Sequence, residues 1–237
     1  MNDASQSPQQ ALVPQGSDVR PLSAAQLEVR RIVRHDMADP RPADAFRDLR
    51  TQLLSRANGA SVVTLVAPVS RGSGGSYVAL NLAAALAFDE TRSAVLIDCN
   101  LRSPVLHERL GVEPASGGLV DYLEGRVGAL REIVYATGVP RLYLVPAGAR
   151  REASGDLLGS ARMRALLDSL RGDSTGVTVV LDSAAVASAP DARILSDLAE
   201  LSVLVAGYGR DTPDAVRESC GVMDRARLAG VVFNRVP

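Results

Sequence analysis

The stretch VVTLVAPVSRGSGGSY, residues 62–77, joins an apolar run to a glycine-rich segment, and it decides the fold. Val62 to Ala67 predicts a β-strand, and a helical pattern from Ser76 to Phe88 follows the glycines directly. A glycine-rich loop between a strand and a helix N-terminus presents free backbone N–H groups and the positive end of the helix dipole, which together suit a phosphate group. A flexible turn with Ser76 near the helix cap explains the same glycines. From the glycines alone, both interpretations stay open.

The same alternation of strand and helix continues along the chain. Short, nearly continuous apolar runs separated by helical segments are typical of a parallel sheet that helices cover on both faces. We therefore predict a doubly wound α/β domain with a mostly parallel sheet over residues 43–237. The further predicted strands are Ala94–Ile97, Leu142–Val145, Val177–Leu181, Leu201–Ala206 and Val231–Phe233, and the further helices are Leu158–Arg171, Ala189–Glu200 and Pro213–Arg227.

The N-terminal part of the chain has a different composition. Residues 1–24 are rich in Gln, Ser, Pro and Ala and predict a disordered arm. Residues 25–42 predict a helix from Ala25 to Arg34 followed by a linker, and a helix from Ala43 to Arg56 then opens the main domain.

The charged residues exclude several classes of function. All 26 basic side chains are arginine, and 27 acidic residues bring the formal net charge to −1. This balance argues against a nucleic-acid-binding protein, which would carry a basic excess. The absence of lysine excludes a Schiff-base lysine and the lysine of a standard phosphate-binding loop. Cys99 and Cys220 form no metal-ligand spacing, and the longest apolar run is too short to span a membrane, so we expect a soluble, cytoplasmic protein.

Two predicted strands end in aspartate. One is followed by Asp98-Cys99-Asn100-Leu101-Arg102 and another by Asp182-Ser183. A carboxylate at the end of a buried strand is costly without a partner. Together with the Ser76 hydroxyl, Asp98 and Asp182 would form an oxygen-rich site suited to Mg²⁺ that bridges nucleotide phosphates. Two alternatives remain open, in which Asp98 caps the next helix and Asp182 bonds a nearby loop amide.

A series of short motifs occurs in a fixed order between about Arg31 and Val236. The motifs are DAFRDLRT (44–51), the loop followed by VALNLA (78–83), VLIDCNLRSP (95–104), GGLVDYL (117–123), LVPAG (144–148), LLGSARM (157–163), VLD (180–182) with Asp191-Ala192, and GVVFNRV (230–236). In these motifs the chain resembles the bacterial tyrosine kinase (BY-kinase) family, the CpsD/CapB/Wzc-like cytoplasmic modules of capsule and exopolysaccharide synthesis.

The resemblance implies a P-loop NTPase-like fold, with ATP or ADP and Mg²⁺ as cofactors. The family's Walker A loop falls on Ser70 to Tyr77, its Walker A′ motif on Asp98 to Arg102, and its Walker B aspartate on Asp182. The implied nucleotide-binding residues are Arg71, Gly72, Ser73, Gly74, Gly75, Ser76 and Tyr77, the implied catalytic residues are Asp98, Asn100 and Asp182, and the implied metal ligands are Ser76, Asp98 and Asp182.

The family's oligomerisation motif is an acidic residue followed by arginines at the third and sixth places, and it falls on Asp44, Arg47 and Arg50. Positions i, i+3 and i+6 drift by about 60° each on a helix, so the three side chains share one flank and could reach a neighbouring subunit. A solvated helix face with a local Asp–Arg pair is the alternative interpretation.

Three departures from the family pattern put the phosphate site in doubt. Gly75 stands where the family has the Walker lysine, Asn100 replaces the second acidic residue of Walker A′, and Ala184-Ala185 replaces a Pro-Pro pair. Removing one partner of a close charge pair costs roughly 2–5 kcal/mol. Arg71 lies in the same loop and could bring a guanidinium to a phosphate in place of the lysine.

The sequence therefore favours a degenerate kinase-like protein with weak or no ATP binding. It would act in the cytoplasm, peripherally at the inner membrane, as a partner or regulator of a membrane polysaccharide co-polymerase, within a homo- or hetero-oligomer. The alternative is an active ATP-dependent tyrosine autokinase that uses Arg71, Ser76, Asp98 and Asp182. A partition-type ATPase of the MinD/ParA group is a third hypothesis, which Ser70 disfavours because it occupies the place of that group's signature lysine.

Overall fold

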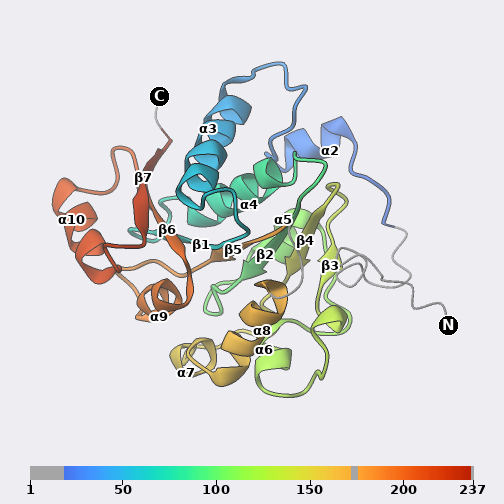
Figure 1. Ribbon diagram of the computed structural model, residues 1–237, viewed down its shortest axis with the longest axis vertical. Coiled ribbons are helices and arrows are strands. Elements are labelled where there is room, and N and C mark those ends of the chain that lie inside the picture. The colour runs from blue at the N-terminus through green and yellow to red at the C-terminus, as the bar shows by residue number, and fades with distance from the viewer. Residues whose placement is uncertain (1–18, 172–175, 236–237) are drawn as a thin grey trace.

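The computed structural model describes residues 19–171 and 176–235 and shows a seven-stranded sheet between layers of helices (Figure 1). The strand order is β3-β4-β2-β5-β1-β6-β7, in which β3 runs antiparallel to β4 and all other neighbours are parallel. The strands are β1 (Val63–Pro68), β2 (Ser93–Asp98), β3 (Tyr135–Ala136), β4 (Leu142–Val145), β5 (Val177–Asp182), β6 (Leu201–Gly207) and β7 (Leu228–Asn234). The predicted doubly wound, mostly parallel α/β fold is confirmed.

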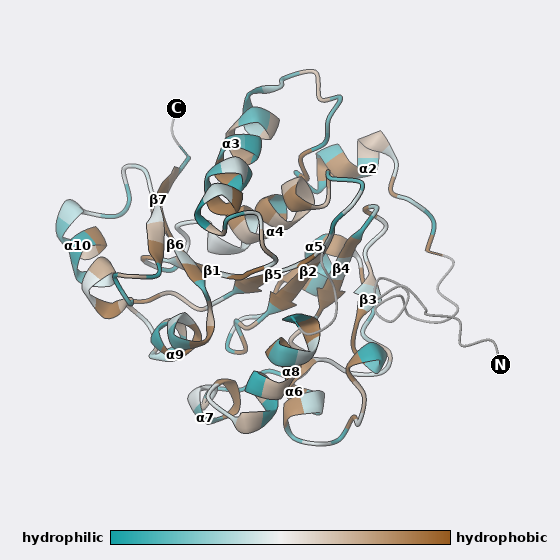
Figure 2. Cartoon of the chain, in the orientation of Figure 1, coloured by the Kyte–Doolittle hydropathy of each residue, from teal (hydrophilic) through white to brown (hydrophobic). Residues whose placement is uncertain are grey.

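Helices cover both faces of the sheet. Every residue of β1, β2 and β5 is buried, which explains why these strands read as continuous apolar runs. One face carries α3 (Arg41–Arg56), α4 (Gly75–Leu86) and α5 (Leu106–Leu110), and the other carries α6 (Leu119–Leu123), α7 (Gly155–Leu158), α8 (Ala161–Arg171) and α9 (Asp191–Leu198). The remaining helices are α2 (Ala24–Val29), α10 (Pro213–Val222) and the 3₁₀ turn η1 (Leu130–Glu132). Figure 2 shows apolar residues gathered in the strands and hydrophilic residues on the outward sides of the helices.

The first predicted helix is shorter than expected. The helix predicted over Ala25–Arg34 ends at Val29, because the chain turns at Arg31, whose φ is 55°. The turn lets the Val33 N–H donate to Asn81 Oδ1 of α4 at 2.8 Å. Packing against α4 therefore ends the helical pattern early.

The bounds of several other helices also differ from the prediction. The helix predicted over Leu158–Arg171 is divided at residues 159–160 into α7 and α8, and the one predicted over Pro213–Arg227 ends at Val222. The short helices α5 and α6 and the two-residue strand β3 were not predicted.

The N-terminal segment meets the domain before α2. Residues 1–18 of the predicted disordered arm lie outside the described residues, whereas the Leu22 N–H donates to Gly138 O at 2.8 Å and Ser23 caps α2. Within the described ranges, no helix combines the length and apolarity that a membrane crossing requires.

Candidate functional site

The predicted phosphate-binding loop leads from the end of β1 to Gly75, the first residue of α4. Gly72 and Gly74 have φ values of 90° and 95°, which residues with side chains rarely adopt, so the turn itself requires glycine at both places. Gly74 is the N-cap, without a side-chain cap, and the Val78 N–H donates to Gly74 O at 3.0 Å. Ser76 lies inside α4 and does not cap it. The first-turn N–H groups of α4 have no partner within the helix, as in anion-binding loops.

Two segments at the ends of the adjacent strands β6 and β7 hold this loop. Asp211, which follows β6, accepts hydrogen bonds from the Ser70 hydroxyl, from the Ser73 hydroxyl at 2.6 Å and from the Gly207 N–H at 2.6 Å. At the end of β7, Asn234 Nδ2 donates to Ser73 O at 2.9 Å. Burial raises the pKa of Asp211, but these hydrogen bonds to its carboxylate outweigh burial and lower the pKa below its usual value. The loop is thus fixed in shape by its neighbours.

An arginine from outside the loop, Arg210, packs against it, whereas Arg71 within the loop does not. Arg71 is exposed and makes no hydrogen bond or ion pair with any part of the chain that the structure describes. Arg210 places its guanidinium carbon 3.1 Å from the point where a Cβ on Gly72 would lie. Sequence reasoning missed Arg210 and Asp211, although both follow a predicted strand at the sheet edge where ligands bind.

The two predicted metal-ligand carboxylates lie side by side. Asp98 and Asp182 are opposite each other in the register of β2 and β5, and both are fully buried. Asp98 accepts hydrogen bonds from the backbone N–H groups of Asn100 (3.2 Å), Val105 (3.2 Å) and Leu106 (3.1 Å). Leu106 begins α5, so Asp98 does bond the N-terminus of the next helix, as one alternative expected. From the residues that the structure describes, Asp182 accepts no hydrogen bond of normal geometry at either oxygen, which contradicts the alternative of a loop-amide partner.

Burial makes both carboxyl groups hard to ionise. It raises the pKa of Asp98 to about 7, even though three backbone N–H groups oppose the rise. Burial, followed by the neighbouring charge of Asp98, raises the pKa of Asp182 well above its usual value. The Ser76 hydroxyl and the Arg109 guanidinium favour the charged form of Asp182 but offset only part of this rise. Positive charge from the described residues therefore compensates the pair only in part.

The residues present fit Mg²⁺, whereas the phosphate loop lacks the lysine that would contact the phosphates of a nucleotide. Asp182 offers two unpartnered carboxylate oxygens, with Asp98 and Ser76 beside it. The described ranges hold no group of three or more His, Cys, Asp or Glu side chains placed to bind a metal, so Mg²⁺ would complete its shell with water or phosphate oxygens. Position 75 has no cation, and the ring of Pro68 lies where a side chain would start. Phosphoryl transfer depends on positive groups that stabilise the negative charge of the phosphates, and the family has such a group at position 75.

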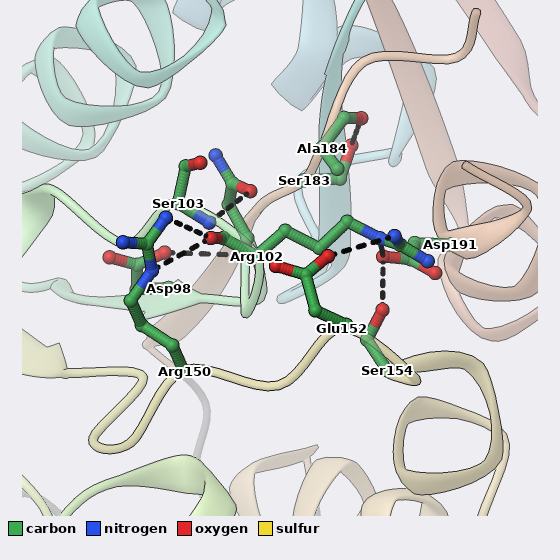
Figure 3. Close-up of polar contacts among 10 residues, drawn as sticks. Asp98, Arg102, Ser103, Arg150, Glu152, Ser154, Ser183, Ala184 and Asp191 are labelled. Carbon is green, nitrogen blue, oxygen red and sulfur yellow. Dashed lines mark hydrogen bonds and ion pairs between the residues drawn. The ribbon is translucent and has the colours of Figure 1, made fainter. Parts of the chain in front are cut away.

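Arg102, the last residue of the Walker A′ match, joins three loops at the same edge of the sheet (Figure 3). Its guanidinium lies 3.5 Å from Glu152 and 3.6 Å from Asp191, the buried first residue of α9. The Ser154 hydroxyl donates to Asp191 at 2.6 Å, and the Arg150 guanidinium donates to Arg102 O at 2.7 and 3.0 Å. The loops after β2, β4 and β5 are therefore fixed to one another.

The other two departures from the family pattern lie in this region. Asn100 is half-buried, and its side-chain oxygen accepts the Ser103 N–H at 3.3 Å, so it holds its own turn. Ala184 and Ala185 are buried after β5, where the Ser183 hydroxyl donates to Ala184 O at 2.9 Å (Figure 3). These residues shape loops beside the carboxylates.

The three residues of the predicted oligomerisation motif make contacts within the chain. Arg47 pairs with Asp44 at 2.7 Å and contacts His35 Nδ1 at 3.1 Å, so the local Asp–Arg pair of the alternative interpretation is present. Arg50 is half-buried and donates to Ala85 O at 3.1 Å, near the C-terminus of α4. That these residues reach a neighbouring subunit stays a prediction.

A groove of about 810 Å³ runs between α3 and β7 and ends at Gly74 of the loop. Leu49 and Leu53 of α3 line one side, and Phe233, which is 60% exposed, lines the other. Tyr77 also lines the groove, and its ring packs edge-on against Phe46 of α3. Burial raises the pKa of the Tyr77 hydroxyl. The groove connects the candidate phosphate site to α3. Arg31, Arg56, Arg109 and Arg235 also line it, against one carboxylate, Asp48.

No protein-family model matches the chain, but individual proteins do. The chain is 32% identical over 226 residues to the putative tyrosine-protein kinase EpsB of Ralstonia solanacearum, a match that covers 92% of this chain and 29% of EpsB. It is 30% identical over 206 residues to the succinoglycan biosynthesis transport protein ExoP of Rhizobium meliloti, covering 81% of this chain and 25% of ExoP. The chain thus spans less than a third of the length of either relative.

Solved structures agree with these matches. The tyrosine kinase domain of BceF is 28% identical to the chain, and the similarity covers 92% of both chains with a TM-score of 0.71. The similarity to a kinase domain therefore extends over nearly all of this chain.

Proposed function

Because the chain belongs to the bacterial tyrosine kinase family, as a CpsD/Wzc-like module, we propose that it is a degenerate kinase homologue that binds nucleotide weakly or not at all. It acts as a cytoplasmic partner of a membrane polysaccharide co-polymerase in exopolysaccharide or capsule synthesis. The names of EpsB, a tyrosine-protein kinase, and of ExoP, a succinoglycan biosynthesis transport protein, support this pathway.

The proposal rests on one observation, the lack of a cation at position 75 beside two buried carboxylates. Asp98 and Asp182, the proposed metal ligands, lie side by side on β2 and β5, whereas Gly75 brings no positive charge to the phosphates that Mg²⁺ would contact. Loss of one partner of a close charge pair costs about 2–5 kcal/mol. At about 1.4 kcal/mol per tenfold change, nucleotide affinity falls some 30-fold to several thousand-fold.

Docking rather than catalysis then gives the protein its role. The groove between α3 and β7 leaves apolar side chains such as Leu49 and Phe233 accessible to another chain. Contact through α3 would hold the protein at the inner membrane by way of its partner, in a homo- or hetero-oligomer.

An active autokinase is the second candidate, and two observations favour it. Asp182 keeps two free oxygens next to Ser76, and Arg210 stands beside the phosphate loop. Arg binds phosphate with a planar fork, which does not reproduce the compact ammonium of lysine in a tight loop.

Calorimetric titration of the full chain separates the two candidates. We expect no binding of Mg-ATP or Mg-ADP at micromolar concentration, and no phosphotyrosine after incubation with ATP. Asp182→Asn tests the metal dependence, because it removes the charge of a proposed metal ligand whose oxygens accept no hydrogen bond of normal geometry from the described residues. Micromolar, Mg²⁺-dependent binding that Asp182→Asn abolishes would refute the degenerate kinase.

A further inference from the structure

Pro68 and Gly75 face each other across the phosphate loop. Pro68 is the last residue of β1, which lies between β5 and β6 in the middle of the sheet. Its backbone is held on both sides, because Pro68 O accepts the Val186 N–H at 2.9 Å and the following N–H, of Val69, donates to Val205 O at 2.9 Å. The proline ring is therefore fixed in position.

A side chain at position 75 would collide with that ring. A Cβ built on Gly75 would lie 2.7 Å from Pro68 Cδ, 2.8 Å from Cγ and 3.0 Å from Cβ. Such distances are shorter than carbon atoms in contact adopt. The ring has no free side-chain rotation that could relieve the contact. Relief would need a shift of β1 or of α4, both of which are packed in the core.

Backbone conformation does not explain the glycine at this position. Gly72 and Gly74 have positive φ values, whereas Gly75 is an ordinary helical residue whose φ is not in the left-handed region. A residue with a side chain could adopt the backbone of Gly75. The contact with the Pro68 ring therefore excludes a side chain there, including the lysine that the family has.

We propose that Pro68 is the residue that determines the loss of phosphate binding, because it leaves no room for a cation at position 75. A lysine at position 75 restores binding only when the ring of residue 68 is removed as well. The inference rests on the proposed function, in which the missing cation is the defect. Glycine is the replacement of choice at position 68, because alanine would keep the Cβ that lies 3.0 Å away.

Four variants of the full chain test this pair. They are Pro68→Gly, Gly75→Lys, the double variant Pro68→Gly/Gly75→Lys, and the control Pro68→Gly/Gly75→Met, which has a side chain of similar length without the charge. Thermal unfolding reports the steric contact, and calorimetric titration with Mg-ADP and Mg-ATP reports phosphate binding. Thermal unfolding needs no nucleotide, so it tests the steric contact by itself.

We expect Gly75→Lys to unfold at a clearly lower temperature than the parent and to gain no nucleotide affinity. The double variant should unfold close to Pro68→Gly and bind Mg-ADP at least tenfold more tightly than both the parent and the methionine control. A double variant that is no more stable than Gly75→Lys would overturn the steric contact between Pro68 and a side chain at position 75. A Gly75→Lys protein that is as stable as the parent would overturn it too.

The two proposals fail in different ways. A folded double variant that gains no affinity over the methionine control overturns the inference that Pro68 determines the loss of binding. Micromolar Mg-ATP binding by the parent overturns the proposed function instead, and the unfolding temperatures of the four variants still decide the steric contact.

Discussion

Asp98 and Asp182 stand opposite each other on β2 and β5, both fully buried, yet among the described residues only Asp98 has donors of normal hydrogen-bond geometry. Parallel strands that end at the same edge of a sheet bring their last residues together, and here those residues are both acids. Two adjacent carboxyl groups in a buried site cannot both ionise without a cation. Folding therefore depends on pH, and on any cation that enters.

The first prediction concerns pH. Burial raises the pKa of Asp98 to about 7 and that of Asp182 well above its usual value, whereas an unfolded aspartate has a pKa of about 3.9. The folded state therefore binds more protons than the unfolded state between about pH 4 and 7. The stability from this pair is fully present below pH 4 and is lost as the pH rises through 7. Asp182→Asn should lessen this loss by about 1–3 kcal/mol.

Urea unfolding at pH 5 and pH 8 measures this difference. Asp156→Asn, at an exposed position of α7, is the control and should keep the pH dependence of the parent. If the free energy of unfolding changed equally between pH 5 and pH 8 in Asp182→Asn and in the parent, the raised pKa values of Asp98 and Asp182 would be contradicted.

The second prediction concerns Mg²⁺ without nucleotide. A cation beside the free oxygens of Asp182 removes the unpaired charge, so MgCl₂ at pH 8 should raise the unfolding temperature of the parent. Each 1 kcal/mol of binding energy corresponds to about 2–4 °C for a chain of this size. Sodium chloride at matched ionic strength should have no such effect, and Asp182→Asn should lose the response. An equal shift in that variant would place the ion elsewhere.

The third prediction concerns the loop itself. Asp211 accepts from Ser70, Ser73 and Gly207, so Asp211→Ala leaves several donors without their acceptor and should cost about 1–3 kcal/mol. Hydrogen exchange should become faster in residues 69–74 while β4 keeps its protection. Uniform acceleration over the whole sheet would mean that Asp211 supports the fold rather than the loop.

The fourth prediction separates the two arginines near the loop. Arg210 lies against Gly72, whereas Arg71 extends into solvent, so Arg210→Ala should weaken any Mg-ADP binding by about tenfold, or about 1.4 kcal/mol. Arg71→Ala should change it less than twofold. The reverse order would restore the sequence-based hypothesis that Arg71 replaces the lysine.

The sequence predicts the sheet better than the site. Strands buried on both faces are continuous apolar runs, so their positions can be read directly. α5 is not predicted because it has only five residues, and its start depends on the Asp98 side chain, which accepts the N–H groups of Val105 and Leu106. Gly75 could be recognised as a lost lysine from the motif. The part played by Pro68 could not be recognised, because it depends on how the six loop residues 69–74 bring the start of α4 back against the end of β1.

The fifth prediction concerns self-association, and the structure decides which variant tests it cleanly. Arg50 donates to Ala85 O at the end of α4, so Arg50→Ala should cost about 1 kcal/mol in the monomer whatever its role between subunits. Arg47 makes exposed contacts with Asp44 and His35, so Arg47→Ala should change stability by about 0.5 kcal/mol or less.

Arg47→Ala is therefore the variant to compare with the parent by analytical sizing. We expect it to move the parent's oligomer toward smaller species while its unfolding temperature stays unchanged. An unchanged elution of Arg47→Ala would remove Arg47 from the interface. A change in Arg50→Ala alone would report damage to the packing of α3 on α4, because that arginine is part of the fold.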